Sequence, residues 1–336
     1  MKTLLRPATA IGRHRCRGLI SVAAQQRVES DTSWLLAGRR PLDHRSDGLP
    51  GLGAILEGVD LTTPFTPEEI ETLLQASDDA GGILVFPNQK PDMTIHEHMD
   101  FGRLLGELEP HAVAVGVPGA QEVLEIVREP KAGVVFGEDW HSDNSFMHKT
   151  CSYSILRGTG VMPKRGANDT MFSSTEAAYD ALSPLMKERL HGLYATHSAG
   201  KAYNAGSGTN SRAAMEATSS MQLLDDAPIL KTDVAQPVVV SHPRTGRPSL
   251  FVSPTFTRGI VGMHGEESDA LLRFLYDWIA RPEFCTRVSW EKHQITMWDN
   301  RSLSHKGVAD DVTEKRVVQR VSIRGTEPIA ATFGGR

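Results

Sequence analysis

Arg316-Val317-Val318-Gln319-Arg320-Val321-Ser322-Ile323 is a run rich in β-branched residues, which predicts a β-strand. Because successive side chains of a strand point to opposite faces, the guanidinium groups of Arg316 and Arg320 would lie on the same face. A surface strand with exposed arginines is the alternative, but it would need a uniformly polar face, and neither face of this run is uniformly polar. The pattern therefore favours a strand in which both arginines are seated beside apolar neighbours.

Further short strands and several helices are predicted along the rest of the chain. Runs rich in β-branched and aromatic residues predict strands at residues 54–56, 83–86, 152–156, 238–241, 249–252, 286–290 and 295–298. Helical spacing and capping signals predict helices at residues 66–81, 94–108, 174–182 and 184–190, and another between the Ser268 cap and Pro282. Short, irregularly spaced strands are typical of a sandwich or jelly roll, and not of a parallel α/β sheet. The expected fold class is therefore mainly β with helical insertions (α+β).

The composition is that of an ordinary globular chain. Of its 336 residues, 40% are hydrophobic and 23% are charged. No apolar run approaches the roughly 20 residues that a membrane-spanning helix needs. Three cysteines without a CxxC pair disfavour a disulfide scaffold or a thiolate zinc site. With thirteen histidines in the chain, any metal chemistry would use imidazole and oxygen ligands.

Basic residues are concentrated at the N-terminus. Residues 1–28 contain six lysines or arginines and no acid, whereas the remaining chain holds all 41 acidic residues. Such a leader resembles an organellar transit peptide. A basic tail with no targeting role is the alternative. A secretory signal is not expected, because the arginines of residues 1–28 interrupt the apolar segment that such a signal needs. We expect residues 1–45 to form a disordered leader. The protein is then expected in an organelle (mitochondrion or plastid) if the leader is a transit peptide, and in the cytoplasm otherwise.

The acidic balance of the remaining chain argues against a nucleic-acid-binding surface. The expected partner is a small molecule, with neither nucleic acid nor membrane as a partner, and a homo-oligomer is left open. Residues 203–220 are rich in Gly, Ser, Asn and Ala and have no clear period, which predicts a lid loop.

Two His-x-Asp triplets are candidate metal-binding motifs, and their secondary structure separates them. His98 and Asp100 fall in a predicted helix, where residues two apart point in nearly opposite directions and could not close on one ion. His141 and Asp143 lie in a polar, non-periodic segment that suits an extended backbone, where residues two apart share a face. We therefore keep only the second triplet, which alone is weak evidence for a metal site.

Other blocks of the sequence strengthen this interpretation. Trp298-Asp299-Asn300-Arg301 ends a predicted strand, and His305 follows in what reads as a polar turn. The relevant blocks, in chain order, are Trp140-His141-x-Asp143, Asn168-Asp169-Thr170, Trp298-Asp299-Asn300-Arg301, His305, Arg316 and Arg320. From about Leu52 to Pro328, the chain resembles the taurine / 2,4-dichlorophenoxyacetate dioxygenase family of Fe(II)- and 2-oxoglutarate-dependent oxygenases.

The resemblance implies a double-stranded β-helix (jelly roll, cupin-like) core flanked by helices. It also implies that His141, Asp143 and His305 are the catalytic facial triad that binds Fe(II), with 2-oxoglutarate and O2 as cosubstrates. Because Asp143 and His305 must then meet on one ion, residues 46–336 are expected to form one jelly-roll dioxygenase domain.

The resemblance assigns further residues to the two organic ligands. Arg316 would form a bidentate pair with the distal carboxylate of 2-oxoglutarate, and Thr170 would donate its hydroxyl to the same carboxylate. Arg320 resembles the position that holds the substrate's sulfonate or carboxylate. The remaining substrate-binding positions implied by the family are His111, Tyr203 and Phe256, although a solvated loop residue (His111) and plain core aromatics (the other two) are the alternatives.

The implied reaction is oxidation of an unactivated C–H of a small anionic substrate (a carboxylate, a sulfonate or an amino-acid derivative), by hydroxylation, desaturation or cyclisation, with release of succinate and CO2. Gly137 stands where taurine-using relatives place a substrate-contacting amide, so taurine itself is not expected. Two other functions stay open: a zinc-dependent hydrolase that uses the same His-Asp-His ligands, which leaves Arg316 and Thr170 without a role, and a non-catalytic jelly-roll ligand-binding protein.

Overall fold

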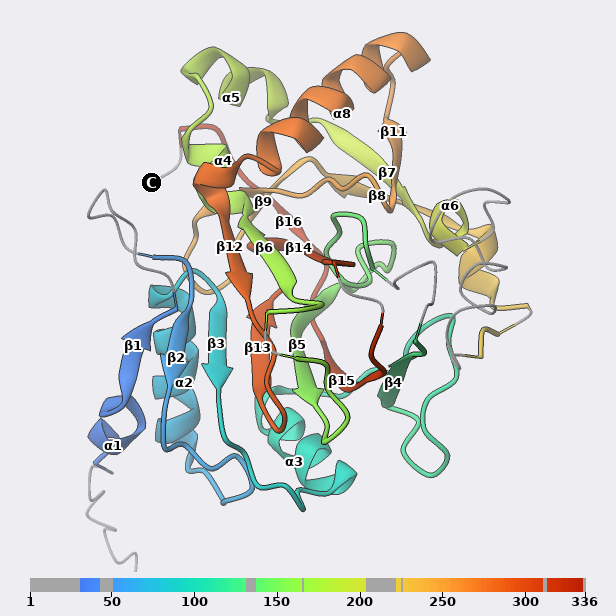
Figure 1. The fold of residues 1–336 in the computed structure, drawn as a ribbon. Coiled ribbons are helices and arrows are strands. Elements are labelled where there is room, and N and C mark those ends of the chain that lie inside the picture. The colour runs from blue at the N-terminus through green and yellow to red at the C-terminus, as the bar shows by residue number, and fades with distance from the viewer. Residues whose placement is uncertain are drawn as a thin grey trace, which may run out of the picture. The chain divides into compact units, whose positions relative to one another are not determined.

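The structure is a computed structural model that describes residues 31–42, 51–130, 137–164, 166–203, 222–224, 226–310 and 313–334 (Figure 1). Residues Thr32–Arg336 form one compact unit. Within it, Leu35 of helix α1 (Ser33–Leu36) is fully buried in the largest core cluster. The folded body therefore begins before residue 46, the boundary expected from the sequence. Residues 1–30 of the predicted leader and residues 204–220 of the predicted lid lie outside the described residues.

The helices largely follow the capping signals of the sequence. The longer ones are α2 (Pro67–Asp79), α3 (Ile95–Leu105) and α8 (Gly265–Ile279); the shorter ones are α4 (Thr175–Asp180), α5 (Pro184–Leu190), α6 (Ala199–Tyr203) and the 3-10 turns η1 (Pro228–Lys231) and η2 (Pro282–Phe284). Thr66 and Thr94 form the capping boxes of α2 and α3. The prediction of Ser268 as a helix N-cap is wrong. Helix α8 begins at Gly265, three residues before Ser268, and its N-cap is His264. The buried Ser268 hydroxyl instead accepts a hydrogen bond from the Ile260 N–H. Among the described residues no helix is long and apolar enough to cross a membrane.

The strands of the described residues form four sheets. The strands are β1 (Arg39–Pro41), β2 (Ala54–Leu56), β3 (Ile83–Phe86), β4 (Val123–Arg128), β5 (Cys151–Gly158), β6 (Thr170–Ser174), β7 (Tyr194–Ser198), β8 (Asp233–Pro237), β9 (Val239–Ser241), β10 (Pro248–Leu250), β11 (Thr257–Ile260), β12 (Cys285–Val288), β13 (Ile295–Asp299), β14 (Leu303–Gly307), β15 (Arg316–Arg324) and β16 (Ile329–Ala330). The seven-stranded sheet has the order β1-β2-β3-β13-β5-β15-β4, and the three-stranded sheets are β10-β9-β16, β11-β7-β8 and β12-β6-β14. Among these described strands, β2 and β3 are the only two that pair in parallel. The fold is mainly β with a few helices, as predicted.

The two faces of the seven-stranded sheet have different neighbours. One face packs against α2 and α3 (Figure 1), and there Val321 and Ile323 of β15 join the largest core cluster. On the other face, Val318 joins a cluster that includes Phe172 of β6 and Leu303 of β14, so this face meets the sheet β12-β6-β14. The alternation predicted for residues 316–323 is confirmed, because Arg316 and Arg320 line the same cavity as Val318.

Not every strand was predicted. The prediction that His305 lies in a polar turn is wrong, because His305 is the central residue of β14. The sequence patterns also do not predict the strands β1, β4, β6, β7, β8, β11 and β16. Strand β14 has the sequence Leu-Ser-His-Lys-Gly, whose local composition does not favour a strand; its backbone pairing with β6 stabilises it.

The capping box of α3 gives a direct test of this part of the fold. The Thr94 hydroxyl accepts a hydrogen bond from the Glu97 N–H at 3.1 Å, and the Glu97 carboxylate accepts one from the Thr94 N–H. We expect Thr94→Ala to lower the free energy of unfolding by about 1 kcal/mol, because a helix N–H loses its acceptor. Thr94→Ser, which keeps the hydroxyl, is the control. Equal stability of the alanine variant and the wild type in urea unfolding would contradict this role.

Candidate active site

Backbone pairing holds together two histidines that are far apart in sequence. The N–H of His141 donates to the carbonyl of His305 at 3.0 Å, and the N–H of His305 donates to the carbonyl of His141 at 2.7 Å. His305 belongs to β14, which pairs with β6, whereas His141 lies in the segment that leads into β5. The Ser142 hydroxyl, which donates to the Leu303 carbonyl at 2.7 Å, reinforces the same pairing. The pairing fixes the side-by-side placement of the two imidazoles.

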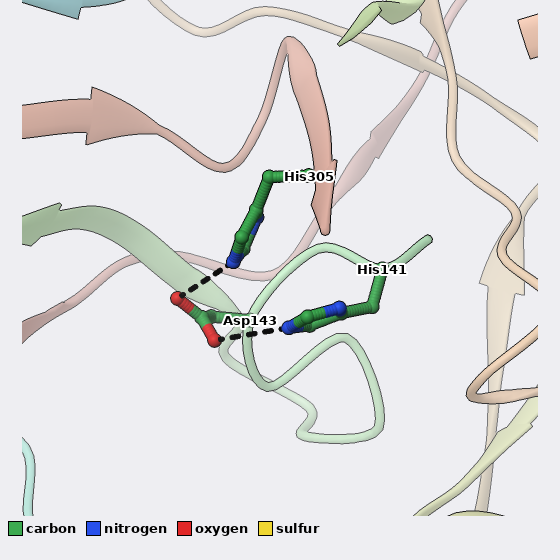
Figure 2. A group of neighbouring side chains, drawn as sticks. All are labelled: His141, Asp143 and His305. Carbon is green, nitrogen blue, oxygen red and sulfur yellow. Dashed lines mark ion pairs between the residues drawn. The ribbon is translucent and has the colours of Figure 1, made fainter. Parts of the chain in front are cut away.

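The Asp143 carboxylate lies between the two imidazoles (Figure 2). Its Oδ1 is 3.8 Å from Nε2 of His141, and its Oδ2 is 3.8 Å from Nε2 of His305. One ligand atom from each of the three residues lies within 4.8 Å of the other two, and all three residues are buried. The structure thus brings together the three side chains predicted as a triad, in an arrangement that could hold one metal ion.

The protonation states of the three residues suit metal binding. Burial lowers the pKa of His141, an effect that Asp143 partly offsets, and burial together with His141 lowers the pKa of His305 well below its ordinary value. The imidazoles are therefore neutral at pH 7. Nδ1 of His141 lies 2.8 Å from the Asp139 carbonyl, which can only accept, so Nδ1 carries the proton and Nε2 presents a lone pair to the centre.

Asp143 is held by three side chains. Burial alone would raise its pKa, but the guanidinium of Arg320 holds the pKa below its usual range, so the carboxylate is ionised. The Ser154 hydroxyl donates to Oδ2 at 2.6 Å, and Arg320 Nη1 pairs with Oδ1 at 2.5 Å. Asn300 accepts from the Asp143 N–H at 3.1 Å and donates to the Ser154 hydroxyl at 2.9 Å.

Neither Ser154 nor Asn300 is among the site residues predicted from the sequence. Asn300 belongs to the block Trp298-Asp299-Asn300-Arg301, which carries part of the family resemblance, so this motif could have indicated that Asn300 belongs to the site. Ser154 lies in a plain strand sequence and offers none, because only the tertiary fold brings it to Asp143.

A cavity of about 50 Å³ joins the histidines to the two arginines. Its polar lining includes His141, His305, Thr170, Arg316 and Arg320. Its remaining lining residues are Ile126, Gly137, Leu156, Asn168, Trp298, Gly307, Val308 and Val318. The two predicted histidine ligands and the predicted cosubstrate residues thus share one cavity, and Asp143 lies beside the two histidines.

The Arg316 guanidinium is suited to an anion. Burial and the neighbouring Arg128 lower the pKa of Arg316 to about 10, so it stays protonated at neutral pH. Among the described residues, none accepts a hydrogen bond from its buried Nε atom. Thr170 lies on the same cavity, and its Oγ1 accepts a hydrogen bond from Nε1 of Trp290 at 3.0 Å. The hydroxyl proton of Thr170 is therefore available to another acceptor.

Arg320 was predicted to hold a substrate anion. In the structure it is 4% exposed and forms the ion pair with Asp143 described above. Its Nε atom is buried, and no acceptor for it exists in the part of the chain that the structure describes. Arg320 therefore has one donor directed at the triad and another that is available to a ligand.

The three remaining predicted substrate residues form a row of ring contacts that leads to the triad. The ring centroids of His111 and Tyr203 are 6.1 Å apart, those of Tyr203 and Phe256 are 6.2 Å apart, and Phe256 lies 5.9 Å from His141. His111 is buried, unlike a solvated loop residue, and its Nδ1 accepts a hydrogen bond from the Val113 N–H. Tyr203 and Phe256 belong to a hydrophobic cluster, and none of the three lines the cavity described above.

A second group of potential metal ligands consists of Asp78, His242 and Asp299. One ligand atom from each of these residues lies within 4.8 Å of the other two. Here the carboxylates already have cationic partners: Arg301 binds Asp299, and Nε of Arg244 lies 2.9 Å from Asp78. His242 Nε2 donates to Asp299 at 2.9 Å. The group is therefore a charge-paired network in which Nε2 of His242 is already used as a donor, whereas Nε2 of His141 presents a lone pair to the centre of the triad.

Comparisons with known proteins agree with this geometry. The chain is similar to an alkylsulfatase of Acinetobacter baylyi (29% identity, 82% of each chain covered) and to an (S)-phenoxypropionate/alpha-ketoglutarate-dioxygenase of Sphingobium herbicidovorans (29% identity, 83% of this chain and 94% of the relative). The crystal structure of a taurine dioxygenase from Burkholderia xenovorans superposes with a TM-score of 0.67 at 30% identity, and the match covers 83% of this chain and 88% of that one.

The family described as "Taurine catabolism dioxygenase TauD, TfdA family" matches residues 42–322. The match spans the triad, both arginines and Thr170, and it confirms the resemblance seen in the sequence. The chain belongs to the TauD/TfdA family of alpha-ketoglutarate-dependent (2-oxoglutarate-dependent) dioxygenases.

Proposed function

We propose that this dioxygenase uses Fe(II) at His141, Asp143 and His305 to oxidise an unactivated C–H of a small organic anion. The observation that carries the proposal is the cavity that joins two residues of the triad, His141 and His305, to Arg316 and Thr170. A zinc hydrolase would need the three ligands and a water molecule, but it would have no use for a charged arginine and a hydroxyl donor beside them. A ligand-binding protein without catalysis would not require the ionised carboxylate and the two neutral imidazoles.

The donor set fits Fe(II). Two neutral imidazole nitrogens and one carboxylate form the arrangement that non-haem Fe(II) oxygenases use, with positions left open for other ligands. Together with 2-oxoglutarate and O2, the bound metal would supply oxidising chemistry that protein side chains lack, with succinate, CO2 and an oxidised substrate as products. Ser154 and Asn300 would hold the Asp143 carboxylate in place while it binds the metal.

The assignment of 2-oxoglutarate to this cavity rests on charge and hydrogen-bonding capacity. Arg316 offers a protonated planar fork that matches a carboxylate. Thr170 offers a hydroxyl proton because its oxygen already accepts from Trp290. The two residues lie on different sheets, Thr170 on β6 and Arg316 on β15, so their meeting depends on the packing of those sheets.

The substrate class follows from Arg320 and from the rings near it. Nη1 of the buried Arg320 already pairs with Asp143, but its buried Nε has no acceptor among the described residues and is suited to an anionic ligand. His111, Tyr203 and Phe256 lie outside the lining of the cavity, and we propose that their row of rings, which reaches His141, extends the substrate site beyond it. The names of the relatives refer to an alkyl sulfatase, a phenoxypropionate dioxygenase and a taurine dioxygenase, which is consistent with a small sulfate, sulfonate or carboxylate here.

Gly137 argues for a substrate other than taurine. It lines the cavity with a positive φ of 77°, and a Cβ atom added there would lie 3.1 Å from Cε1 of His141. An amide side chain at this position would be strained and would crowd a proposed metal ligand. We therefore infer that this enzyme recognises the non-reacting end of its substrate differently from taurine-using relatives.

The remaining sequence-based expectations stand as proposals. We propose a double-stranded β-helix core. The packing of the seven-stranded sheet against the sheet β12-β6-β14 supports this proposal. Residues 203–220 are proposed to form a lid, and no nucleic-acid or membrane partner is proposed. Residues 1–28 are proposed to be a leader, with an organelle (mitochondrion or plastid) as the location if the leader is a transit peptide and the cytoplasm otherwise.

Binding of the metal and cosubstrate gives the first test of this function. Anaerobic addition of Fe(II) and 2-oxoglutarate to the purified protein is expected to give a weak visible charge-transfer band. His141→Ala should lose the band because a predicted metal ligand is removed. A wild-type protein that gives no band, or a band unchanged in His141→Ala, would rule out the oxygenase assignment and leave the hydrolase and the binding protein as alternatives.

Arg316 and Arg320 are expected to bind different ligands, so their alanine variants should lose different functions. Arg316→Ala should weaken 2-oxoglutarate binding by at least about tenfold, since a bidentate charged pair is lost. Arg320→Ala should spare 2-oxoglutarate affinity and impair turnover that depends on substrate. Because Arg320 also pairs with Asp143, Fe(II) affinity must be measured in both variants. Equal loss of 2-oxoglutarate affinity in the two variants would contradict this division, and succinate release across a panel of small anions would identify the substrate.

The proposed leader can be tested by deletion. A protein lacking residues 1–28 should keep wild-type kcat and KM for 2-oxoglutarate and substrate, because the family match begins beyond them. Thermal unfolding of the same protein should be unchanged. Failure of the truncated protein to fold would show that these residues are structural and would overturn their assignment as a leader.

A further inference from the structure

Trp290 contacts both residues that are proposed to bind the distal carboxylate of 2-oxoglutarate. Its indole Nε1 donates to Oγ1 of Thr170 at 3.0 Å, and the guanidinium carbon of Arg316 lies 5.6 Å from the centroid of its ring. The side chain is 1% exposed. It is absent from the lining of the cavity, so it stands behind the two residues and not beside the ligand.

The position of Trp290 is rigidly determined. It follows β12, which pairs with β6 so that Val288 lies opposite Thr170. The Ser289 hydroxyl, next to Trp290, donates to the Asp169 carboxylate at 3.0 Å, and Arg287 forms an ion pair with the same carboxylate. The residues on either side of the Trp290–Thr170 hydrogen bond are therefore joined by further polar contacts, and the indole has little freedom to move.

The indole acts differently on its two neighbours. An indole N–H can only donate, so the Thr170 oxygen accepts from Trp290 and must direct its own proton elsewhere. Arg316 lies within the range of a cation–π contact, in which a ring face attracts a guanidinium and orients its plane. Both effects prepare donors for a carboxylate before it arrives, which lowers the ordering cost of binding.

We propose that Trp290 is a positioning residue that preorganises Thr170 and Arg316 for the distal carboxylate of 2-oxoglutarate. This inference rests on the proposed function and deepens it, because it assigns part of the cosubstrate affinity to a residue that does not touch the cosubstrate. A purely structural role is the alternative, since Trp290 also belongs to the core cluster between the two sheets. A structural role predicts loss of stability without a selective change in 2-oxoglutarate affinity.

The test is Trp290→Phe, which keeps an aromatic ring and removes the N–H donor. Its matched control is Trp278→Phe, because the Trp278 indole also donates a hydrogen bond, to the Ala178 carbonyl at 2.8 Å, but lies on α8 away from the cavity. The measurement is a titration of the Fe(II)-loaded protein with 2-oxoglutarate under anaerobic conditions, followed by the charge-transfer band and by calorimetry. Fe(II) affinity and thermal unfolding are recorded for each variant.

Trp290→Phe is expected to raise the Kd for 2-oxoglutarate by about 5- to 10-fold, as the loss of one buried hydrogen bond allows. Its Fe(II) affinity should be unchanged, because Trp290 does not contact the triad. Trp278→Phe should leave both affinities unchanged. In turnover assays the effect should fall on the KM for 2-oxoglutarate more than on the KM for substrate.

A double-mutant cycle with Thr170→Val identifies the route of the effect. If the indole acts through the Thr170 hydroxyl, Trp290→Phe added to Thr170→Val should cause little further loss of 2-oxoglutarate affinity. Fully additive losses would overturn that route. The proposal is also overturned if Trp290→Phe binds 2-oxoglutarate as tightly as the wild type and Trp278→Phe. A wild type that shows no binding would instead refute the proposed function, so the two failures are distinguishable.

Discussion

The two backbone hydrogen bonds between His141 and His305 are the constraint on which the rest of the site depends. They join the segment before β5 to β14, and thereby place two imidazoles on either side of the Asp143 carboxylate (Figure 2). Backbone bonds are suited to this task, because they fix the main chain without using the side-chain nitrogens that a metal would need. The additional pairing of β14 with β6 carries Thr170 to the same cavity.

Because side chains alternate between the two faces of the seven-stranded sheet, one face of the sheet packs in the hydrophobic core and the other contributes residues to the site. On one face, aliphatic residues such as Val321 pack against α2 and α3, and this core supports the sheet. On the other face, Arg316 and Arg320 of the same strand meet the site. A one-residue shift of β15 would exchange the two faces and place both arginines in the apolar core, so the register of this strand is under strong energetic control.

Much of the fold could be read from local patterns. The capping boxes at Thr66 and Thr94 and the alternation of residues 316–323 depend on neighbouring residues alone, and the structure agrees with them. Strand β14 and the start of α8 were misjudged for the opposite reason. The conformation of His305 is stabilised by pairing with β6 and with His141, and Ser268 is bound by Ile260. Such partners are distant in sequence, so local propensity could not indicate them.

The sequence by itself determined the family, the class of chemistry and the identity of the candidate ligands. The order of the blocks around His141, His305 and Arg316 along the chain is enough to recognise the family. Tertiary structure decided which atoms face one another. Only packing could show that Asn300 and Ser154 brace Asp143, that Arg320 pairs with it, and that Trp290 stands behind Thr170 and Arg316. The physical reason is that hydrogen bonds and ion pairs act over a few ångströms in space, whatever the separation of their partners along the chain.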